Sequence, residues 1–257
     1  MTGARRVIAI TGAGGALGGA LSRHFATEPE TDLVLSDISA ASLDATVAGL
    51  AEPRGGIEKQ LADVSQVAEV EAVVGRAVER FGRLDVLISN AGVLSPNGRI
   101  HNLATEDWER AFRVNLLGAV NGIRAAAPVM RAQRAGSIVL TASVAGLTAW
   151  SHAAPYCATK AAVINLTQTA ALELRPMNVR VNCVCPGMID TPMLGQMNAS
   201  FEALFPVPID DLIAGKQGRY GDPADIARAV AYLASDAAEF VTGVAMPVDN
   251  ALSASLF

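Results

Sequence analysis

The sequence has few aromatic residues: they make up only 5% of its 257 positions, although 51% of the residues are hydrophobic. Alanine, valine, leucine and isoleucine must therefore supply most of the core. A chain of this length can bury most of its apolar surface in one large domain. The composition favours short buried strands under helices over a β-sandwich.

Long hydrophobic runs are also lacking, since none reaches the roughly 20 residues that cross a membrane. Two arginines near the N-terminus precede an apolar stretch, but the glycines of residues 12–19 interrupt it too early for a signal peptide. We therefore expect a cytoplasmic protein with no membrane partner.

The chain has no basic block and carries a net charge of −5, so we expect no nucleic-acid partner. Its three cysteines are an odd number, which argues against a disulfide framework. Cys183 and Cys185 share one face of a predicted strand without accompanying histidines. We interpret both as buried hydrophobic residues and predict no metal site.

Short apolar segments alternate with segments of helical periodicity along the whole chain. Apolar strands that alternate with helices predict a parallel sheet covered on both faces. The predicted fold class is therefore α/β, a doubly wound single domain over residues 1–257 with about seven parallel strands. We expect strands at 5–11, 32–37, 57–61, 84–90, 137–143, 179–186 and 243–248, and helices at 40–50, 65–81, 105–134 with a break near Pro128, around 156–160, and 223–233.

A glycine-rich turn at residues 12–18 joins the first predicted strand to a helix. Glycines there let backbone N–H groups approach a pyrophosphate at the positive end of the helix. The fit to the pattern G-x-G-x-x-G is imperfect, because Leu17 stands at the third glycine position. A glycine turn without a ligand is the alternative interpretation.

Asp37 ends the second predicted strand, nineteen residues after Gly18. A carboxylate at this place can accept hydrogen bonds from a ribose 2′-hydroxyl, and it would repel a 2′-phosphate. No compensating cation is supplied by Ala13, Gly14 or Ile38. This favours NAD over NADP as the cofactor, with a cap on the following helix as the alternative role of Asp37.

Tyr156 and Lys160 lie four residues apart in a predicted helix, so they share one face. An ammonium beside a phenol favours the ionised phenol. Ser143 ends the strand before this helix. A hydroxyl and a phenol with a cationic neighbour can act as an acid–base device on an alcohol or carbonyl. The alternative is a solvated pair on the helix surface.

The connection around residues 188–218, which follows the sixth predicted strand, is rich in Met, Leu and Phe and is interrupted by prolines. Ligands of open α/β sheets bind outside the carboxyl ends of the strands, and such long connections are often functional. We predict a substrate lid here. A small surface subdomain packed on its own Met and Phe residues is the alternative.

These motifs occur in one order: Thr11-Gly12 with Gly18, then Asn90-Ala91-Gly92, then Tyr156 with Lys160, then Pro186-Gly187. In this the chain resembles, over essentially its whole length, the short-chain dehydrogenase/reductase family of the short, single-domain type. The resemblance implies a Rossmann fold, a small-molecule alcohol or ketone substrate, and a homotetramer.

The resemblance also implies a role for each motif residue. Tyr156 would be the general base that removes the alcohol proton while hydride passes to NAD, and Ser143 would bind the substrate oxygen. Lys160, together with the positive nicotinamide ring, would lower the pKa of Tyr156; Lys160 would also hold the nicotinamide ribose, and Asn115 would anchor a water path. The implied cofactor-binding residues are Gly12, Gly14, Gly15, Ala16, Leu17, Gly18, Asp37, Ile38, Asp63, Val64, Asn90, Ala91, Gly92, Tyr156, Lys160, Pro186, Gly187, Ile189 and Thr191.

The candidate substrate wall is largely apolar, which predicts a moderately sized, mostly hydrophobic secondary alcohol or ketone. A 3-oxoacyl reductase, a hydroxysteroid-type dehydrogenase and a non-catalytic NAD-sensing protein are the alternatives. His152 is either a polar substrate contact or a cap or surface residue. The wall residues are Leu94, Ala145, Trp150, His152, Met188, Leu194 and Met197.

Two positions depart from the family pattern. Ala16 replaces the middle glycine of the turn, which hinders cofactor binding only if its φ angle is positive. Asn250 and Ala251 replace the two glycines of the usual VDGG. Since asparagine tolerates left-handed backbone, we expect that turn to survive.

Overall fold

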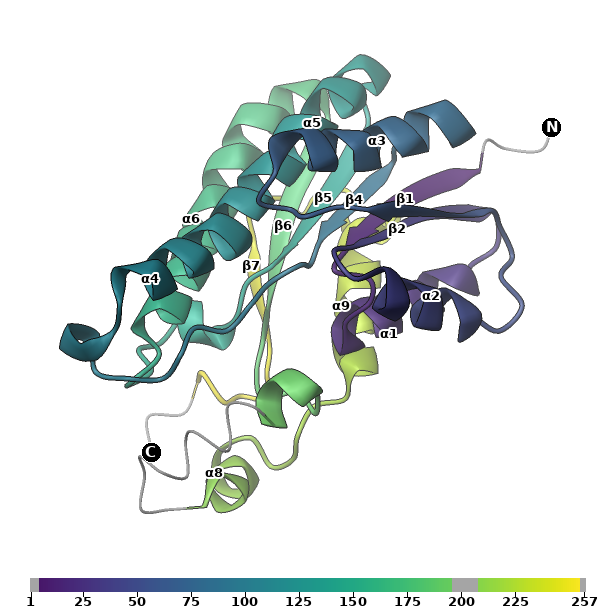
Figure 1. The fold of residues 1–257 in the computed structure, drawn as a ribbon. Helices are drawn as coiled ribbons and strands as arrows, with labels where there is room; N and C mark the ends of the chain where they lie inside the picture. The colour runs from purple at the N-terminus through teal and green to yellow at the C-terminus, as the bar shows by residue number, and fades with distance from the viewer. Residues whose placement is uncertain (1–4, 196–207, 255–257) are drawn as a thin grey trace.

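A seven-stranded parallel sheet forms the centre of the computed structural model, which describes residues 5–195 and 208–254 (Figure 1). The strand order is β3-β2-β1-β4-β5-β6-β7, and every neighbouring pair is parallel. This confirms the predicted doubly wound α/β fold. The strands are β1 (Arg6–Thr11), β2 (Thr31–Asp37), β3 (Ile57–Leu61), β4 (Val86–Ser89), β5 (Gly136–Thr141), β6 (Val179–Pro186) and β7 (Ala245–Val248).

Helices cover both faces of the sheet, as Figure 1 shows. One face carries α3 (Val67–Phe81), α5 (Gly118–Gln133) and α6 (Ala154–Leu174), and the other carries α1 (Ala16–Ala26), α2 (Ala40–Ala48) and α9 (Pro223–Ala234). The order of the strands reverses between β1 and β4. Open α/β sheets bind ligands beside such a switch point, at the carboxyl ends of the strands.

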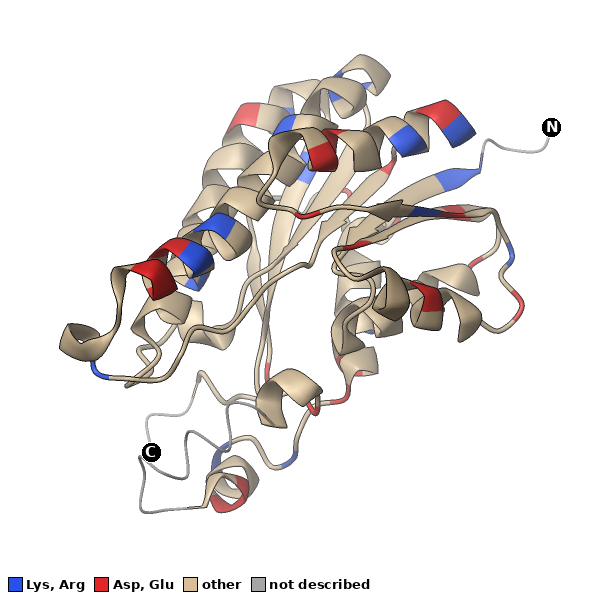
Figure 2. Cartoon of the chain, in the orientation of Figure 1, with Lys and Arg blue, Asp and Glu red and all other residues tan. Residues whose placement is uncertain are grey.

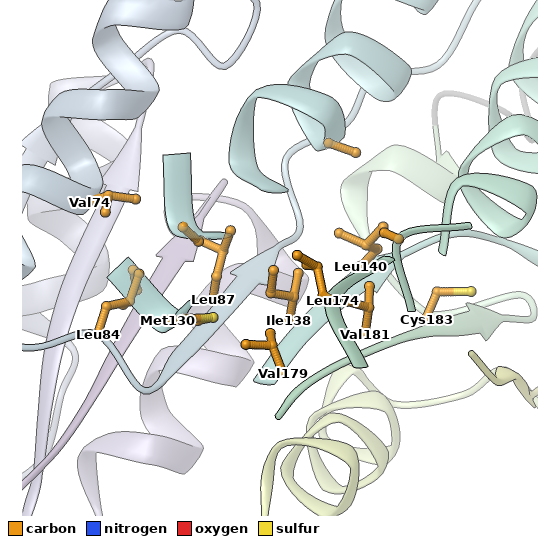
Figure 3. Close-up of a cluster of buried hydrophobic side chains, with 14 of the residues drawn as sticks. Val74, Leu84, Leu87, Met130, Ile138, Leu140, Leu174, Val179, Val181 and Cys183 are labelled. Carbon is orange, nitrogen blue, oxygen red and sulfur yellow. The ribbon is translucent and has the colours of Figure 1, made fainter. Parts of the chain in front are cut away.

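The core under α3, α5 and α6 is built from aliphatic side chains (Figure 3). Leu87 of β4, Ile138 of β5 and Val181 of β6 lie in one cluster with Met130 of α5. Cys183 lies in the same cluster, and both it and Cys185 are free and fully buried. The interpretation of these two cysteines as small core residues is confirmed.

The predicted helix over 105–134 is divided, but not at Pro128. It consists of α4 (Thr105–Ala111), a π-helical stretch (Phe112–Leu117) and α5, and Pro128 lies inside α5. The predicted break at Pro128 is therefore wrong. Arg124 and Pro128 are both exposed, so the carbonyl that loses its N–H partner at the proline can bond to water.

Part of the predicted lid belongs to a separate hydrophobic cluster. Helix α8 (Ile209–Lys216) buries Ile209 and Ile213 against Met188, Leu194 and Leu252. Residues 196–207, and with them Met197, lie outside the described residues. Closure of this region over a substrate stays a prediction.

Charged residues of both signs are interspersed over the outer helices, as Figure 2 shows. Among the helices described, none has both the length and the apolar composition needed to span a bilayer.

Candidate active site

A cavity of about 960 Å³ opens at the carboxyl ends of the strands, a size at the upper end of the range of ligand sites. The segments that line it include the turn after β1, the residues that follow β2, β3 and β5, the loop after β4, the start of α6, and the residues that follow β6. The predicted catalytic and cofactor motifs therefore converge on one place, although they are far apart in the sequence.

The turn after β1 needs glycine at two positions for steric reasons. Gly12 has a φ of +67°, and a Cβ atom on it would lie 2.7 Å from the Cα of Ala91. A Cβ on Gly18 would overlap the carbonyl oxygen of Gly12. Ala16 is the first residue of α1 and is not among the described residues with positive φ. Its extra methyl therefore adds no backbone strain.

Asp37 holds the backbone of two neighbouring turns. Its Oδ2 accepts a hydrogen bond from the N–H of Gly14 (2.9 Å), and its Oδ1 accepts one from Ser39 (2.9 Å). The N-cap of α2 is Ser39, whose hydroxyl accepts from Ser42. Asp37 thus supports the start of α2 as well as the cavity wall, and each carboxylate oxygen keeps a further lone pair for a ligand hydroxyl.

Asn90 ties the carboxyl ends of three strands together. Its amide nitrogen donates to the carbonyls of Thr11 (3.2 Å) and Gly12 (3.3 Å), and its amide oxygen accepts from the hydroxyl of Thr141 (3.3 Å). The Thr11 hydroxyl in turn accepts from the backbone of Asn90 and Ala91. These bonds fix β1, β4 and β5 beside the cavity.

Ser143, Tyr156 and Lys160 meet at the cavity floor. Ser143 lies just beyond β5, and its hydroxyl accepts from the N–H of Ala145 (3.1 Å) and interacts with the Tyr156 phenol. The Lys160 Nζ atom lies 5.6 Å from the centre of the Tyr156 ring and donates to the carbonyl of Thr141 (2.8 Å). The arrangement places two hydroxyls and an ammonium around one point.

Asn115 lies behind this group in the π-helical stretch, a form of helix that is frequent at functional sites. Its amide bonds both the N–H (2.8 Å) and the C=O (2.9 Å) of Val93, and it also donates to the Thr159 hydroxyl (3.1 Å). A Cβ on Gly92 would lie 3.3 Å from Asn115 Oδ1 and 3.4 Å from Lys160 Nζ. Glycine therefore keeps the space between these two polar atoms open.

Burial changes the proton affinity of both ionisable groups in the site. Lys160 is only 3% exposed, and this burial lowers its pKa to about 8, against a smaller rise from the Cys185 and Cys183 thiols. Burial raises the pKa of Tyr156, and the hydrogen bond with Ser143 only partly offsets that rise. The expectation was that Lys160 and a bound nicotinamide ring together lower the pKa of Tyr156, and it stays a prediction.

Comparison with known proteins shows the family. The family described as "Enoyl-(Acyl carrier protein) reductase" matches residues 12–253. The chain is 36% identical to 3-oxoacyl-acyl-carrier-protein reductase FabG of Thermotoga maritima, over 96% of this chain and 97% of that protein. It is 37% identical to meso-2,3-butanediol dehydrogenase of Serratia marcescens, over 97% and 95%. The chain belongs to the short-chain dehydrogenase/reductase family.

Solved structures agree with this family assignment. Levodione reductase is similar with a TM-score of 0.93 and 34% identity, over 97% of this chain and 98% of that one. NAD+-bound xylitol dehydrogenase is similar with a TM-score of 0.91 and 31% identity, over 97% of this chain and the whole of that one. The family's members act on alcohol or keto groups as oxidoreductases.

The residues predicted from the family motifs can now be placed. Every residue predicted to bind the cofactor lines the cavity, whereas Asn115 lies behind its wall. Of the predicted substrate wall, Leu94, Ala145, Trp150, Met188 and Leu194 line it.

His152 is not among the described residues that line the cavity, and its role as a substrate contact stays a prediction beside the alternative of a cap or surface residue. Its Nδ1 atom is hydrogen-bonded to the Ser151 hydroxyl (2.8 Å), and its carbonyl accepts from the N–H of Gly98 (2.9 Å). With a φ of +67° it shapes the turn before α6.

Sequence reasoning missed several lining residues. Arg110 and Arg113 reach the cavity from α4 and the π-helical stretch, and Ser95, Asn97 and Met193 reach it from loops. The two arginines could have been found from helical spacing, since they lie three residues apart and therefore share a helix face. The loop residues carry no such periodic signal.

The departure at the C-terminal turn is accommodated. Asn250 and Ala251 have φ angles of +44° and +69°, so both keep the left-handed backbone that the family's glycines adopt readily. The side chain of Asn250 donates to the carbonyl of Gln217 (2.7 Å). This bond helps to hold the turn in a conformation that alanine disfavours.

Among the described residues, no group of three or more His, Cys, Asp or Glu is placed to hold a metal ion.

Proposed function

We propose that this protein is an NAD-dependent oxidoreductase that interconverts a secondary alcohol and a ketone, with Tyr156 as the general acid/base. The observation that carries the proposal is the convergence of Ser143, Tyr156 and Lys160 on the cavity that the glycine turn and Asp37 also line. The first group supplies acid–base chemistry, and the second supplies the cradle for a dinucleotide.

The glycine turn fits a nicotinamide dinucleotide by its shape. Side chains at Gly12 and Gly18 would collide with the backbone, and the turn leads directly into the N-terminus of α1. The positive end of a helix favours a pyrophosphate. Asp37 lines the same cavity, and its neighbour Ile38 is apolar and 71% exposed. A carboxylate beside an apolar side chain favours a ribose diol over a 2′-phosphate, and so NAD over NADP.

In the direction of oxidation, a dinucleotide held by the glycine turn and Asp37 would supply the acceptor for the hydride of the substrate carbon. The protein's own residues handle the proton. Ser143 donates a hydrogen bond to the substrate oxygen, and the Tyr156 phenolate removes the hydroxyl proton. In ketone reduction Tyr156 returns that proton to the oxygen.

Lys160 favours the phenolate that this step requires. Below its pKa of about 8 the side chain is an ammonium, and its Nζ lies 5.6 Å from the ring centre of Tyr156. An adjacent positive charge lowers the pKa of a phenol, which opposes the effect of burial. A water in the space beside Gly92 would connect Lys160 to Asn115 and return protons from solvent.

The wall of the cavity suggests the substrate class. Trp150, Met188 and Leu194 present apolar surface beside the catalytic group, which suits a mostly hydrophobic secondary alcohol or ketone. Relatives named for levodione and for meso-2,3-butanediol support a small-molecule substrate. A 3-oxoacyl reductase is the second candidate, favoured by the similarity to the Thermotoga maritima enzyme. We further propose that the protein is cytoplasmic and forms a homotetramer.

The test is the absorbance of NADH after mixing the protein with NAD and a panel of secondary alcohols, repeated with NADP. We expect reduction of NAD with hydrophobic alcohols and weak or no reduction of NADP. Binding of NAD without reduction across a broad panel would favour a non-catalytic sensor. A substrate profile dominated by charged acids would contradict the apolar pocket, and reduction of NADP alone would contradict the role of Asp37.

A further inference from the structure

The segment Pro186–Thr191, which follows β6, forms one wall of the cavity. Its backbone is held at two points: the N–H of Gly187 donates to Val248 (3.1 Å), and the N–H of Asp190 donates to Gly221 (2.9 Å). Met188 lies between these points and packs on α8 with Ile209 and Ile213. The position of Met188 therefore decides the shape of this wall.

Gln217 holds Met188 from behind. Its Oε1 accepts from the N–H of Met188 (2.9 Å), and its Nε2 donates to the C=O of Met188 (2.8 Å) and of Arg219 (2.8 Å). We call a side-chain amide that bonds both backbone groups of one residue an amide clamp. Gln217 is only 2% exposed and does not line the cavity, so it can act on a ligand only through Met188 and its neighbours.

The clamp is itself fixed from two sides. The N–H of Gln217 donates to the carbonyl of Ile213 (2.8 Å), and its own carbonyl accepts from the side chain of Asn250 (2.7 Å). A Cβ on Gly187 would lie 2.5 Å from Gln217 Oε1. The amide can therefore lie against this wall only because residue 187 is glycine.

Two other side chains form amide clamps, one beside the cavity and one away from it. Asn115 clamps Val93 on the loop after β4, which is another wall of the same cavity. Gln133 clamps Leu84 (3.0 and 2.8 Å) and donates to the carbonyl of Ala135 (3.3 Å), before β4 begins and away from the cavity. Gln133 makes the same three kinds of hydrogen bond as Gln217, and in both cases the third bond goes to the carbonyl two residues further along the chain. No described residue of the cavity lining adjoins Gln133.

We propose that Gln217 is a positioning residue for cofactor binding, which sets Met188 and the adjoining backbone so that the nicotinamide half of the dinucleotide is held. The proposal rests on the proposed function, in which a nicotinamide dinucleotide occupies this cavity. Asp37 and the glycine turn form the opposite part of the cavity, and Gln217 does not touch them. Gln217 therefore affects binding of the nicotinamide half alone.

The experiment compares the affinity of two ligands, NAD and ADP-ribose, which lacks the nicotinamide ring. In Gln217→Leu we expect NAD to bind about tenfold more weakly, equivalent to about 1.4 kcal/mol, while the affinity for ADP-ribose changes less than about twofold. The KM for NAD should rise by a similar factor. Asn250→Gly, which removes only the support of the clamp, should change NAD binding in the same sense by about threefold.

Gln133→Leu is the matched control, because it removes the same three hydrogen bonds at the other end of the sheet. It should lower the unfolding temperature and leave the ratio of the two affinities unchanged. If Gln217→Leu does not fold, Asn250→Gly decides the question.

A parallel loss of NAD and ADP-ribose affinity, or no loss at all, would overturn the positioning role of Gln217. If the wild type prefers NADP, the same ratio of affinities is measured with NADP and 2′-phospho-ADP-ribose. A wrong choice between NAD and NADP therefore does not affect the test of Gln217. If the wild type binds NAD but reduces none of it, the catalytic proposal fails while the binding ratio still tests Gln217. A wild type that binds neither dinucleotide would overturn both.

Discussion

The two ends of the parallel strands use the same kinds of hydrogen bond for different purposes. Before β4, Asp85 accepts from the N–H of Val7 (2.8 Å) and pairs with Arg83 (2.7 Å), and these groups satisfy one another. At the carboxyl ends, Asn90 and Asn115 hold backbone in the same way, but the backbone they hold lines or adjoins the cavity. Similar polar chemistry thus stabilises one end and shapes a site at the other.

This comparison gives a general expectation. Changes at the carboxyl ends should alter turnover or ligand binding more than stability, and changes at the amino ends should do the reverse. Buried polar groups that lose a partner cost about 1–3 kcal/mol at either end. Activity and unfolding must therefore be measured together to separate the two ends.

The largest effect is expected for Tyr156→Phe. The variant removes the hydroxyl that transfers the proton, and general acid–base catalysis contributes about 10²–10⁴-fold. We expect turnover to fall about a thousandfold, with NAD affinity and unfolding temperature close to wild type. Steady-state kinetics and NAD titration check this. Turnover as fast as that of the wild type would contradict the assignment of Tyr156 as the general acid/base.

Lys160→Met should abolish activity and at the same time raise the free energy of unfolding. Burial lowers the pKa of Lys160 from 10.5 to about 8, so the folded state binds fewer protons than the unfolded state between these two pH values. Wild-type stability therefore rises with pH across that window, and at pH 7 the buried ammonium is destabilising by roughly 3 kcal/mol. Replacement by methionine also removes the bond to Thr141, which costs about 1 kcal/mol.

We therefore expect Lys160→Met to be inactive and about 2 kcal/mol more stable than wild type at pH 7. The gain should shrink as the pH rises from 8 toward 10.5. Urea unfolding at pH 7 and pH 10 measures both values. A variant that is less stable than wild type at pH 7 would show that the ammonium is well solvated or paired in the folded protein.

Asp37→Asn tests the cofactor end of the cavity. The substitution removes the charge and keeps an acceptor for only one of the two backbone N–H groups, those of Gly14 and Ser39, that Asp37 binds. Hydrogen bonds to charged groups contribute about 1.5–3 kcal/mol, so we expect NAD affinity to fall at least about tenfold. Affinity for NADP should fall less or rise, because repulsion of its 2′-phosphate is removed. Titration of both cofactors decides, and an equal loss for both would contradict the ribose role.

The sequence predicted most accurately the features that depend on local signals. The strands over 57–61 and 179–186 were predicted with the bounds that the structure has, and for 179–186 the signal is a run rich in apolar and β-branched residues. The need for glycine at Gly12 and Gly18 follows from the chemistry of one turn. The motifs around Tyr156 also lie within one short segment.

Features that depend on distant packing could not be predicted. Gln217 and Met188 are 29 residues apart, and nothing local shows that a glutamine in this connection is buried. The positive φ of His152 is likewise not signalled by its residue type. Pro128 leaves α5 intact because it is exposed, and exposure is set by tertiary structure.

Asp85→Ala should have the smallest effect and confine it to stability. The variant leaves the N–H of Val7 without its partner and frees Arg83. An unsatisfied backbone N–H costs about 1–3 kcal/mol, and the exposed part of the ion pair with Arg83 adds little. We expect the free energy of unfolding to fall by about 1–2 kcal/mol, with kcat and KM unchanged. A kinetic effect as large as that of Asp37→Asn would show that the amino ends of the strands also control the site, and the comparison between the two ends would fail.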